Sequence, residues 1–533
     1  MQLPATHAEV HAKQFNQSAV FMPTNHADPG RGSTDFPQDA DIYEMLWIRL
    51  NKAMSKIPGE QNIRYLPNTE LHKIIDIETS RKIFSLMSNL DHRSLDTHAS
   101  KVTHDSPRLF AITIYLRLPL TLLLHLMEID FSDKNLPWIG APPPGLGERD
   151  SEYFTHLINH QWQFTPMVFS KIGLHEKLNA DTIIPFLKRQ PCGYGVFSTV
   201  SRIRLESSHQ NLYSTPQDPN PELALKVIHQ YMDSTTTFQN ETALLHGLGE
   251  LQNPHIVKLL YTYEQNDMYH LIFPAAECNL DEHMAQDPQG FEDPKSTLFC
   301  EFTSWILHQL SGIAAAVNHM HEWTCSTTVP GSTAYHHDLK PSNLLLFKEL
   351  DFEVPRFGIL QIADFGSGRL RGPGTGTGST TFRGTPTYAA PESIVPRMSH
   401  NNGLEIYVSR SYDVWSLGCI AMEVLVWLVF GAQGRKDFNK ERFGPVSMTQ
   451  ENDGYFVLGL DGNATVRVQV IEWFDKLREH PRLPQENALC GLLVLIINTL
   501  EVNSDKRITA REFSQRLDSL VEHADNRLGY GSA

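Results

Sequence analysis

Cysteine is scarce in this sequence. The six cysteines are widely scattered, and no two of them form a C-x-x-C pair: Cys192, Cys278, Cys300, Cys325, Cys419 and Cys490. This spacing excludes the common zinc-binding patterns and a dense disulfide framework, and it indicates reduced thiols. The N-terminal stretch is polar and lacks the apolar segment of a secretory signal. We therefore predict an intracellular protein, in the cytoplasm, the nucleus or both.

The sequence also has few positive charges relative to its negative charges, and its long apolar stretches are interrupted by charged residues. The 45 Lys and Arg residues face 61 Asp and Glu residues, which gives a net charge of −16. Such a balance argues against nucleic acid and against an anionic membrane surface as partners. Two apolar stretches, residues 110–129 and 414–431, carry Arg117 and Glu423. A charge inside a membrane span is costly, so we predict buried helices and no membrane span.

The chain divides by composition into four parts. Its 533 residues are enough for two or three domains. Residues 1–40 are predicted to be disordered. In residues 41–178 the apolar residues recur at helical spacing, and no motif there indicates a particular chemistry. Residues 179–525 begin with short apolar strands and continue with long helices, which predicts an α+β fold. Residues 526–533 form a short tail, and no internal repeats are visible.

A glycine-rich segment lies between the first two predicted strands of this α+β part. Gly193, Gly195, Phe197 and Val200 fit the pattern G-x-G-x-F-x-x-V. Glycine lets a backbone close over phosphates and direct its N–H groups at them. Ser198 stands where the pattern usually has a third glycine. Taken alone, the segment is better interpreted as an ordinary hairpin turn.

A lysine occupies the next predicted strand. Lys226 lies in the apolar run LALKVI, where an unpaired charge would be costly. Glu241 follows in a predicted helix and is the expected ionic partner, whereas Glu250 is a poorer alternative near the helix end. A surface ion pair is the less specific interpretation.

The most informative segment is YHHDLKPSN, residues 335–343. Phosphoryl transfer needs a carboxylate that orients the attacking hydroxyl, a cation near the γ-phosphate, and oxygen ligands for Mg²⁺. Asp338, Lys340 and Asn343 supply these groups within one short loop. Asp338 is therefore the predicted catalytic base, and Asn343 a predicted metal ligand.

Two further motifs follow at suitable distances. Asp364, Phe365 and Gly366 come directly after an apolar strand, so that Asp364 is a second predicted Mg²⁺ ligand. The stretch GTPTYAAPE ends at Glu392 and closes a segment that begins at Asp364.

With these motifs, residues 179–525 resemble a eukaryotic protein kinase domain of the serine/threonine type. The resemblance implies a bilobal fold, the cofactors ATP and Mg²⁺, and protein substrates. The helical extension and polar inserts are similar to those of kinases from filamentous fungi.

The resemblance also implies roles for further residues. Thr385 would contact Asp338 and Lys340, and Glu392 would form a buried ion pair with Arg507. Asp413 would hold the backbone of the catalytic loop. Residues 271–277 would contact adenine, with Ile272 as gatekeeper and Ala275 in the hinge. His336, Phe365 and Gly366 would give structural support.

One departure from the family pattern concerns regulation. His337 stands where the family usually has an arginine that binds a phosphorylated residue of the activation segment. A neutral histidine cannot make the same bidentate contact. We therefore expect little dependence on phosphorylation of that segment, whose candidate sites are Thr377, Ser379, Thr380 and Thr381.

Two polar inserts, residues 327–333 and 435–465, are a second departure, and we interpret them as surface loops rather than docking elements. Three alternatives to an active kinase remain at this stage. The chain could be a pseudokinase or scaffold, although Lys226, Asp338, Asn343 and Asp364 are all present. It could be a small-molecule phosphotransferase, although that class lacks the A-P-E motif. The helical region could also carry the main function.

Overall fold

The structure is a computed structural model. It describes residues 38–60, 62–87, 90–170, 175–195, 198–229, 234–249, 252–323, 333–371, 384–394, 397–398, 404–405, 409–447, 450–484 and 487–528.

The N-terminal region is a helical unit with a hydrophobic core of its own. Its helices are α2 (Gln38–Ala53), α3 (Asn68–Ile74), α4 (Ile77–Phe84), α5 (His92–Asp105), α6 (Pro107–Tyr115), α7 (Leu120–Glu128) and α8 (Glu148–His160). A short hairpin of β1 (Ser55–Lys56) and β2 (Arg64–Tyr65) follows α2. Leu50, Phe110, Leu123 and Phe154 are fully buried in this core. The apolar stretch 110–129 is thus a pair of packed helices, as predicted.

A six-stranded sheet follows in the order β3-β7-β8-β6-β5-β4. Its strands are β3 (His175–Lys177), β4 (Phe186–Tyr194), β5 (Ser198–Leu205), β6 (Leu223–Ile228), β7 (Tyr261–Gln265) and β8 (Met268–Pro274), with helix α9 (Ser234–Gly249) between β6 and β7. The edge strand β3 pairs with β7 in parallel, so the sheet draws one strand from the sequence before residue 179.

Direct hydrogen bonds join the helical region to the turn that follows β5. The first N–H groups of a helix have no partner within the helix. In α3 the Asn68 N–H donates to His209 Nε2 at 3.0 Å, and the Thr69 N–H donates to Ser208 Oγ at 3.4 Å. Phe169, in the connection before β3, is fully buried with its ring edge-on to that of Tyr261 at 5.1 Å. This connection therefore covers one face of the sheet.

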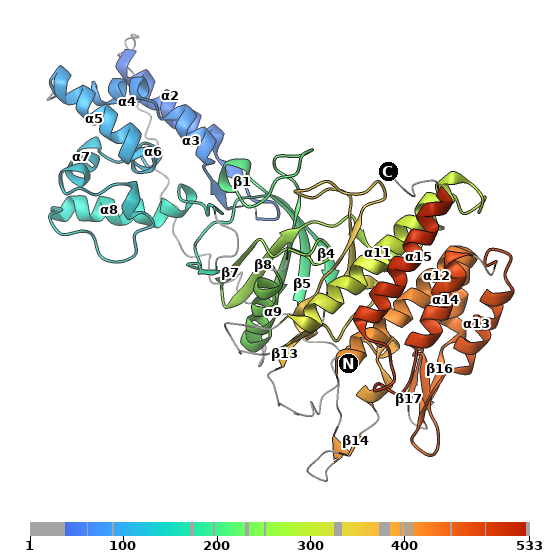
Figure 1. Cartoon of the computed structure of the whole chain (residues 1–533). Coiled ribbons are helices and arrows are strands. Elements are labelled where there is room, and N and C mark those ends of the chain that lie inside the picture. Colours follow the sequence, from blue (N-terminus) through green and yellow to red (C-terminus); the bar gives the residue numbers. More distant parts are fainter. Residues whose placement is uncertain are drawn as a thin grey trace, which may run out of the picture.

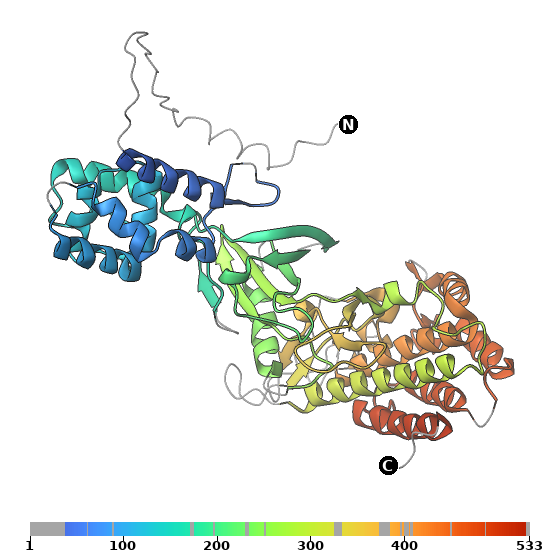
Figure 2. The same cartoon turned by 90° about the horizontal axis from the view of Figure 1, so that it is seen from above.

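The remaining chain forms a larger, mainly helical lobe. Its helices are α10 (Leu280–His283), α11 (Thr297–Glu322), α12 (Arg410–Glu441), α13 (Val468–Glu479), α14 (Ala488–Thr499) and α15 (Ala510–Leu528). Its short strands are β9 (Cys278–Asn279), β10 (Thr333–Tyr335), β11 (Leu344–Phe347), β12 (Ile359–Ile362), β13 (Arg369–Arg371), β14 (Arg397–Met398), β15 (Leu404–Glu405), β16 (Gly444–Ser447), β17 (Gln450–Asn452), β18 (Phe456–Leu458) and β19 (Ala464–Val466). Figures 1 and 2 show the sheet between the N-terminal helices and this lobe.

Helix α12 contains the second apolar stretch of the sequence. It is long and apolar enough to cross a membrane, and 94% of its apolar window is buried inside the protein. Packing against its neighbours therefore accounts for its hydrophobicity. Its axis is interrupted at Gly431, whose φ of 72° is readily adopted only by glycine.

The interpretation of residues 435–465 as surface loops is wrong. Residues up to Glu441 continue α12, and β16–β19 form two hairpins after it. Arg442 and Tyr455 are fully buried. Polar composition was misleading here because the buried charge is paired, and pairing partners cannot be read from local sequence. The other insert, residues 327–333, falls almost entirely outside the described residues.

Candidate active site

The glycine-rich segment and the strand lysine lie in one row across the sheet. Gly193 on β4 pairs with Val200 on β5, and Val200 pairs with Lys226 on β6. Residues that pair directly point to the same face of a sheet. Next to the end of β4, the Gly195 N–H donates to the Ser198 carbonyl at the start of β5 at 2.7 Å. The sheet therefore presents Val200 and Lys226 side by side on one face.

Lys226 forms two ionic contacts. Its Nζ lies 2.7 Å from Glu241 Oε1 on α9 and 2.8 Å from Asp364 Oδ1. Burial alone would lower the pKa of Lys226, but the Asp364 and Glu241 carboxylates outweigh it and raise that pKa above its ordinary value. In return, Lys226 lowers the pKa of Asp364 to about 2. Both groups are thus charged at neutral pH. The alternative partner, Glu250, lies outside the described residues.

Asp364, Phe365 and Gly366 are held in a specific backbone geometry. Asp364 has a φ of 63°, which costs about 1–3 kcal/mol in a non-glycine residue. The Phe365 ring is fully buried and packs edge-on to His336 at 5.0 Å. A Cβ on Gly366 would lie 3.3 Å from Asp364 Oδ1 and 3.7 Å from Lys226 Nζ. Glycine at this position therefore leaves room for the ion pair.

Asp338, Lys340 and Thr385 form a closed set of hydrogen bonds. Asp338 Oδ1 accepts from the Thr385 N–H at 2.9 Å and from Thr385 Oγ1 at 2.8 Å. Lys340 Nζ donates to Asp338 Oδ2 and to Thr385 Oγ1, both at 2.8 Å. The side chain of Asp338 is 11% exposed, so a small group can still reach it. This arrangement suits the orientation of an attacking hydroxyl.

Asn343 joins the same loop through its amide nitrogen. Nδ2 donates to the Asp338 carbonyl at 2.8 Å and to Asp338 Oδ2 at 3.2 Å. The Oδ1 oxygen of Asn343 is thereby turned away from Asp338, and the carboxylate of Asp364 is half exposed. An amide oxygen and an ionised carboxylate are the ligands that Mg²⁺ prefers. These two residues therefore fit a divalent cation held together with substrate phosphates.

Asp413 on α12 holds the backbone of the loop. Its carboxylate is fully buried and accepts from the His336 N–H at 3.0 Å and the His337 N–H at 2.8 Å. His321 donates to it from Nε2 at 3.0 Å. Although burial opposes the shift, His321 lowers the pKa of Asp413 well below its usual range. His337, whose φ is 62°, is kept in this strained conformation by the Asp413 contact.

Glu392 and Arg507 form the expected buried ion pair. Arg507 Nη1 lies 2.8 Å from Glu392 Oε1, and Nη2 lies 3.0 Å from Glu392 Oε2. This bidentate contact fixes the end of the segment that begins at Asp364, since Arg507 also donates to the Ser411 carbonyl at the start of α12.

The register of β8 places Ile272, the predicted gatekeeper, on the face of the sheet opposite Lys226. Ile272 pairs with Leu225 and Phe273 pairs with Ala224, whereas Leu271 pairs with Lys226. Because neighbouring residues alternate between faces, Phe273 shares the Lys226 face and Ile272 lies on the opposite one, beside Tyr261. Sequence alone could not separate the two, since a one-residue slip exchanges the faces. Ala275 lies just after β8 in the predicted hinge.

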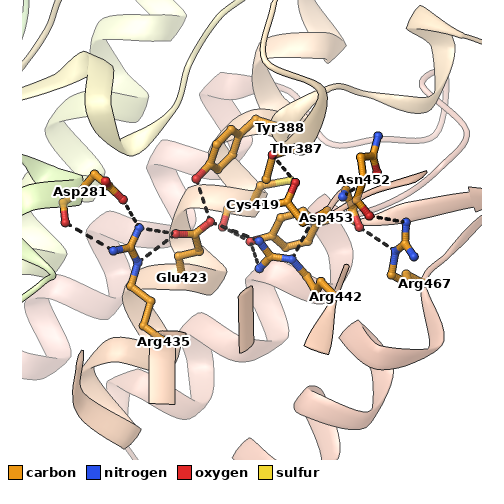
Figure 3. A network of polar contacts seen from close by, with 12 residues as sticks. Asp281, Thr387, Tyr388, Cys419, Glu423, Arg435, Arg442, Asn452, Asp453 and Arg467 are labelled. Carbon is orange, nitrogen blue, oxygen red and sulfur yellow. Dashed lines mark hydrogen bonds and ion pairs between the residues drawn. The ribbon is translucent and has the colours of Figure 1, made fainter. Parts of the chain in front are cut away.

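The sequence prediction missed several residues around these groups. His321 is one, and the network of Glu423, Arg435 and Arg442 beneath Tyr388 is another (Figure 3). Buried charges in an otherwise apolar helix were the available signal for Glu423. Thr377, Ser379, Thr380 and Thr381 lie outside the described residues.

Comparison with known proteins agrees with this geometry. Residues 192–517 match the family described as protein kinase domain. Serine/threonine-protein kinase PKH3 of Eremothecium gossypii is 29% identical over 249 residues, which are 45% of this chain and 28% of that protein. Cyclin-dependent kinase-like 4 of Mus musculus is 26% identical over 235 residues, 44% of this chain and 54% of that protein. Serine/threonine-protein kinase ppk6 of Schizosaccharomyces pombe is 26% identical over 260 residues, which are 46% of this chain and 28% of that protein. The chain thus spans between 28% and 54% of the length of these curated relatives.

Proposed function

Since this chain belongs to the protein kinase family, we propose that it is an active serine/threonine protein kinase, which transfers the γ-phosphate of ATP to protein hydroxyl groups. The observation that carries the proposal is the closed set of hydrogen bonds among Asp338, Lys340 and Thr385. The names of the relatives PKH3 and ppk6 support the serine/threonine type.

Asp338 would act on the acceptor hydroxyl. Its carboxylate accepts the hydroxyl proton as the oxygen attacks the γ-phosphorus, and the bond to the β-phosphate oxygen breaks to release ADP. Lys340 stands next to Asp338 and would balance charge on the transferred phosphoryl group. Thr385 bonds both side chains and so fixes their mutual position.

The opposite side of the site would hold the nucleotide. Lys226, kept in place by Glu241, would contact the phosphates beneath the glycine-rich turn. Asn343 and Asp364 would hold Mg²⁺, which supplies positive charge to the β- and γ-phosphates when bound.

The alternative is a scaffold that uses the kinase fold to bind partners without transfer. That function would not require Asp338 to be bonded to Lys340 and Thr385, or Lys226 to be paired with Glu241. Because all of these contacts are present together, we favour catalysis.

The test is phosphate transfer from radiolabelled ATP to dephosphorylated casein, protamine and the chain itself. We expect labelling by the wild type and a loss of at least about 100-fold in Asp338→Asn, because a general base contributes this much or more. Asp96→Asn serves as the control, because Asp96 is exposed in the helical region. Equal, negligible labelling by wild type and Asp338→Asn would favour the scaffold.

Regulation is also part of the proposal. The His337 ring packs against Tyr335 at 5.4 Å and Tyr412 at 5.5 Å, where it takes the place of a cationic side chain. We expect activity to depend little on a phosphorylated activation segment. Thr381→Ala should then retain activity within about tenfold of wild type, and a larger loss would reject this expectation.

A further inference from the structure

The hairpins β16–β19, between α12 and α13, are anchored by a buried arginine. Arg442 is fully buried, and its guanidinium lies 4.1 Å from the centre of the Phe438 ring and 4.2 Å from that of Tyr455. Its Nε donates to the Asp453 carbonyl at 3.1 Å and its Nη1 donates to Tyr455 Oη at 3.0 Å. Tyr455 Oη in turn donates to the Cys419 carbonyl of α12 at 3.0 Å. Residues 453–455 are therefore fixed against α12.

The same short segment contacts the residues that follow Thr385. Thr387 Oγ1 donates to Asp453 Oδ1 at 2.5 Å (Figure 3). A Cβ on Gly454 would lie 3.6 Å from the Pro386 carbonyl oxygen, so the two backbones run close together. The insert thus reaches the active-site segment directly.

The neighbouring residue Tyr388 is held from the α12 side. Its hydroxyl donates to Glu423 Oε1 at 2.8 Å. Glu423 is fully buried, and Arg435 donates to its Oε2 from Nε at 3.0 Å and from Nη2 at 2.8 Å. Arg435 also pairs with Asp281, and Arg442 Nη2 lies 3.5 Å from Glu423 Oε1, so that two arginines balance the two carboxylates. Thr387 and Tyr388 are therefore bonded to two different parts of the chain (Figure 3).

The position of this segment restricts the path of an acceptor protein. A hydroxyl that reacts must come within hydrogen-bond distance of Asp338. Thr385 contacts Asp338 through both its N–H and its hydroxyl, and residues 386–388 continue from it as a single 3-10 turn. An acceptor hydroxyl at Asp338 would therefore bring the polypeptide beside it close to Thr385 and to the turn that follows.

We propose that Asp453 is a positioning residue for the acceptor protein, because it holds Thr387 in the turn after Thr385. This proposal rests on the proposed function. It assigns the insert a role in binding the acceptor. Both Thr387 and Asp453 are partly exposed, so they lie at the surface where an acceptor would bind. The nucleotide side of the site, formed by Lys226 and the glycine-rich turn, makes no part of this contact.

The test compares four variants with the wild type in transfer from ATP to casein and protamine. Asp453→Ala and Thr387→Val each remove the hydrogen bond, and we expect either to raise the KM for the acceptor about 5- to 10-fold, the effect of one lost hydrogen bond that acts on the acceptor through the turn. The KM for ATP should stay within about twofold. The double variant should be no worse than either single one, since both remove the same bond. Asp453→Asn keeps an oxygen that can accept from Thr387 and should restore most of the affinity.

The matched control is Asp461→Asn, in the turn between β18 and β19, because Asp461 is exposed and its carboxylate accepts hydrogen bonds from the N–H and the side-chain amide of Asn463. An unchanged acceptor KM in Asp453→Ala, or an equal rise in the KM for ATP, would overturn the proposal.

Amide hydrogen exchange tests this proposal independently of the proposed function, because the measurement does not require catalysis. The Tyr388 N–H donates to the Thr385 carbonyl at 3.1 Å and the Ala389 N–H to the Pro386 carbonyl at 3.3 Å. We expect both amides to exchange at least about fivefold faster in Asp453→Ala, and at the wild-type rate in Asp461→Asn. Unchanged exchange in Asp453→Ala would refute the positioning role, whether or not the wild type transfers phosphate. Absent transfer with faster exchange would instead refute the proposed function, and with it the acceptor role, while the support of the turn by Asp453 would stand.

Discussion

At the scale of single residues, the site depends on hydrogen bonds that each link two functional groups. Thr385 is the clearest case, because its hydroxyl accepts from Lys340 and donates to Asp338. Asp413 does the same for the backbone, since one buried carboxylate holds two successive N–H groups of the catalytic loop. Removal of such a bridging group disturbs two partners at once, and a bonded network is more sensitive than its separate contacts.

The prediction at this scale concerns the Thr385 hydroxyl. Thr385→Val keeps the shape of the side chain but leaves Lys340 and Asp338 without their common partner. We expect kcat to fall about 10- to 100-fold with a near-constant KM for ATP, as for a lost interaction made in the transition state. Steady-state kinetics with radiolabelled ATP measures both constants.

Thr385→Ser is the matched control, since it retains the hydroxyl and should keep kcat within about threefold of wild type. Equal losses in the valine and serine variants would show that the methyl group, and not the hydroxyl, is what matters.

At the scale of elements, the connection before β3 acts as part of the sheet. Phe169 packs edge-on to Tyr261 and lies 6.0 Å from the ring of Tyr263. Its backbone also forms a parallel bridge with Gln210. The strand β3 that follows adds hydrogen bonds to the edge of the sheet. The connection before β3 and the strand β3 therefore complete the sheet, although this part of the sequence resembles a linker.

The prediction at this scale is a loss of stability in Phe169→Ala. Truncation of a fully buried phenylalanine leaves a cavity and costs about 3–5 kcal/mol of unfolding free energy. Phe352→Ala is the control, because Phe352 is 39% exposed and its truncation should change stability by less than about 1 kcal/mol. Thermal unfolding of the full chain compares the two. A melting temperature of Phe169→Ala equal to that of the control would show that the connection does not stabilise the sheet.

At the scale of the whole molecule, we expect stability to depend on pH through histidines that the fold buries. Burial lowers the pKa of His270 to about 4 and that of His283 to about 4. His270 is stacked on Tyr263 at 4.3 Å, and His283 lies among the rings of Phe302, Trp305 and Trp427. Neither environment favours a charged imidazole.

The prediction at this scale is acid sensitivity between pH 6.5 and 4. An unfolded histidine binds a proton below about pH 6.5, whereas folded His270 binds it only below about 4. In this window the unfolded chain takes up more protons, so the free energy of unfolding falls as the pH falls. For His270 the loss is about 2–3 kcal/mol at pH 4.5.

Denaturant unfolding at pH 7 and pH 4.5 measures this loss. His270→Phe keeps a ring against Tyr263 but cannot be protonated, so its stability should fall less with acid than that of the wild type. An identical decrease in both proteins would contradict the assignment of the effect to His270.

Much of the site could be predicted because its functional residues lie close together in short stretches of sequence. Asp338, Lys340 and Asn343 lie within one loop, so that their mutual positions depend little on the rest of the chain. The pairing of Lys226 with Glu241 was predictable because a charge on a buried strand needs a partner. The roles themselves, including those of Asn343 and Asp364 toward Mg²⁺, stay predictions until activity is measured.

The sequence alone therefore determined which residue types meet at the site, because phosphoryl transfer requires a few groups at fixed short spacings. The tertiary structure decided what depends on distant contacts and on register. It put Phe273 rather than Ile272 on the Lys226 face, since the face follows from strand pairing and not from residue type. It also placed Asp453 of the polar insert against Thr387 and buried Arg442 beside Glu423, since a charge can be buried only where a distant partner neutralises it.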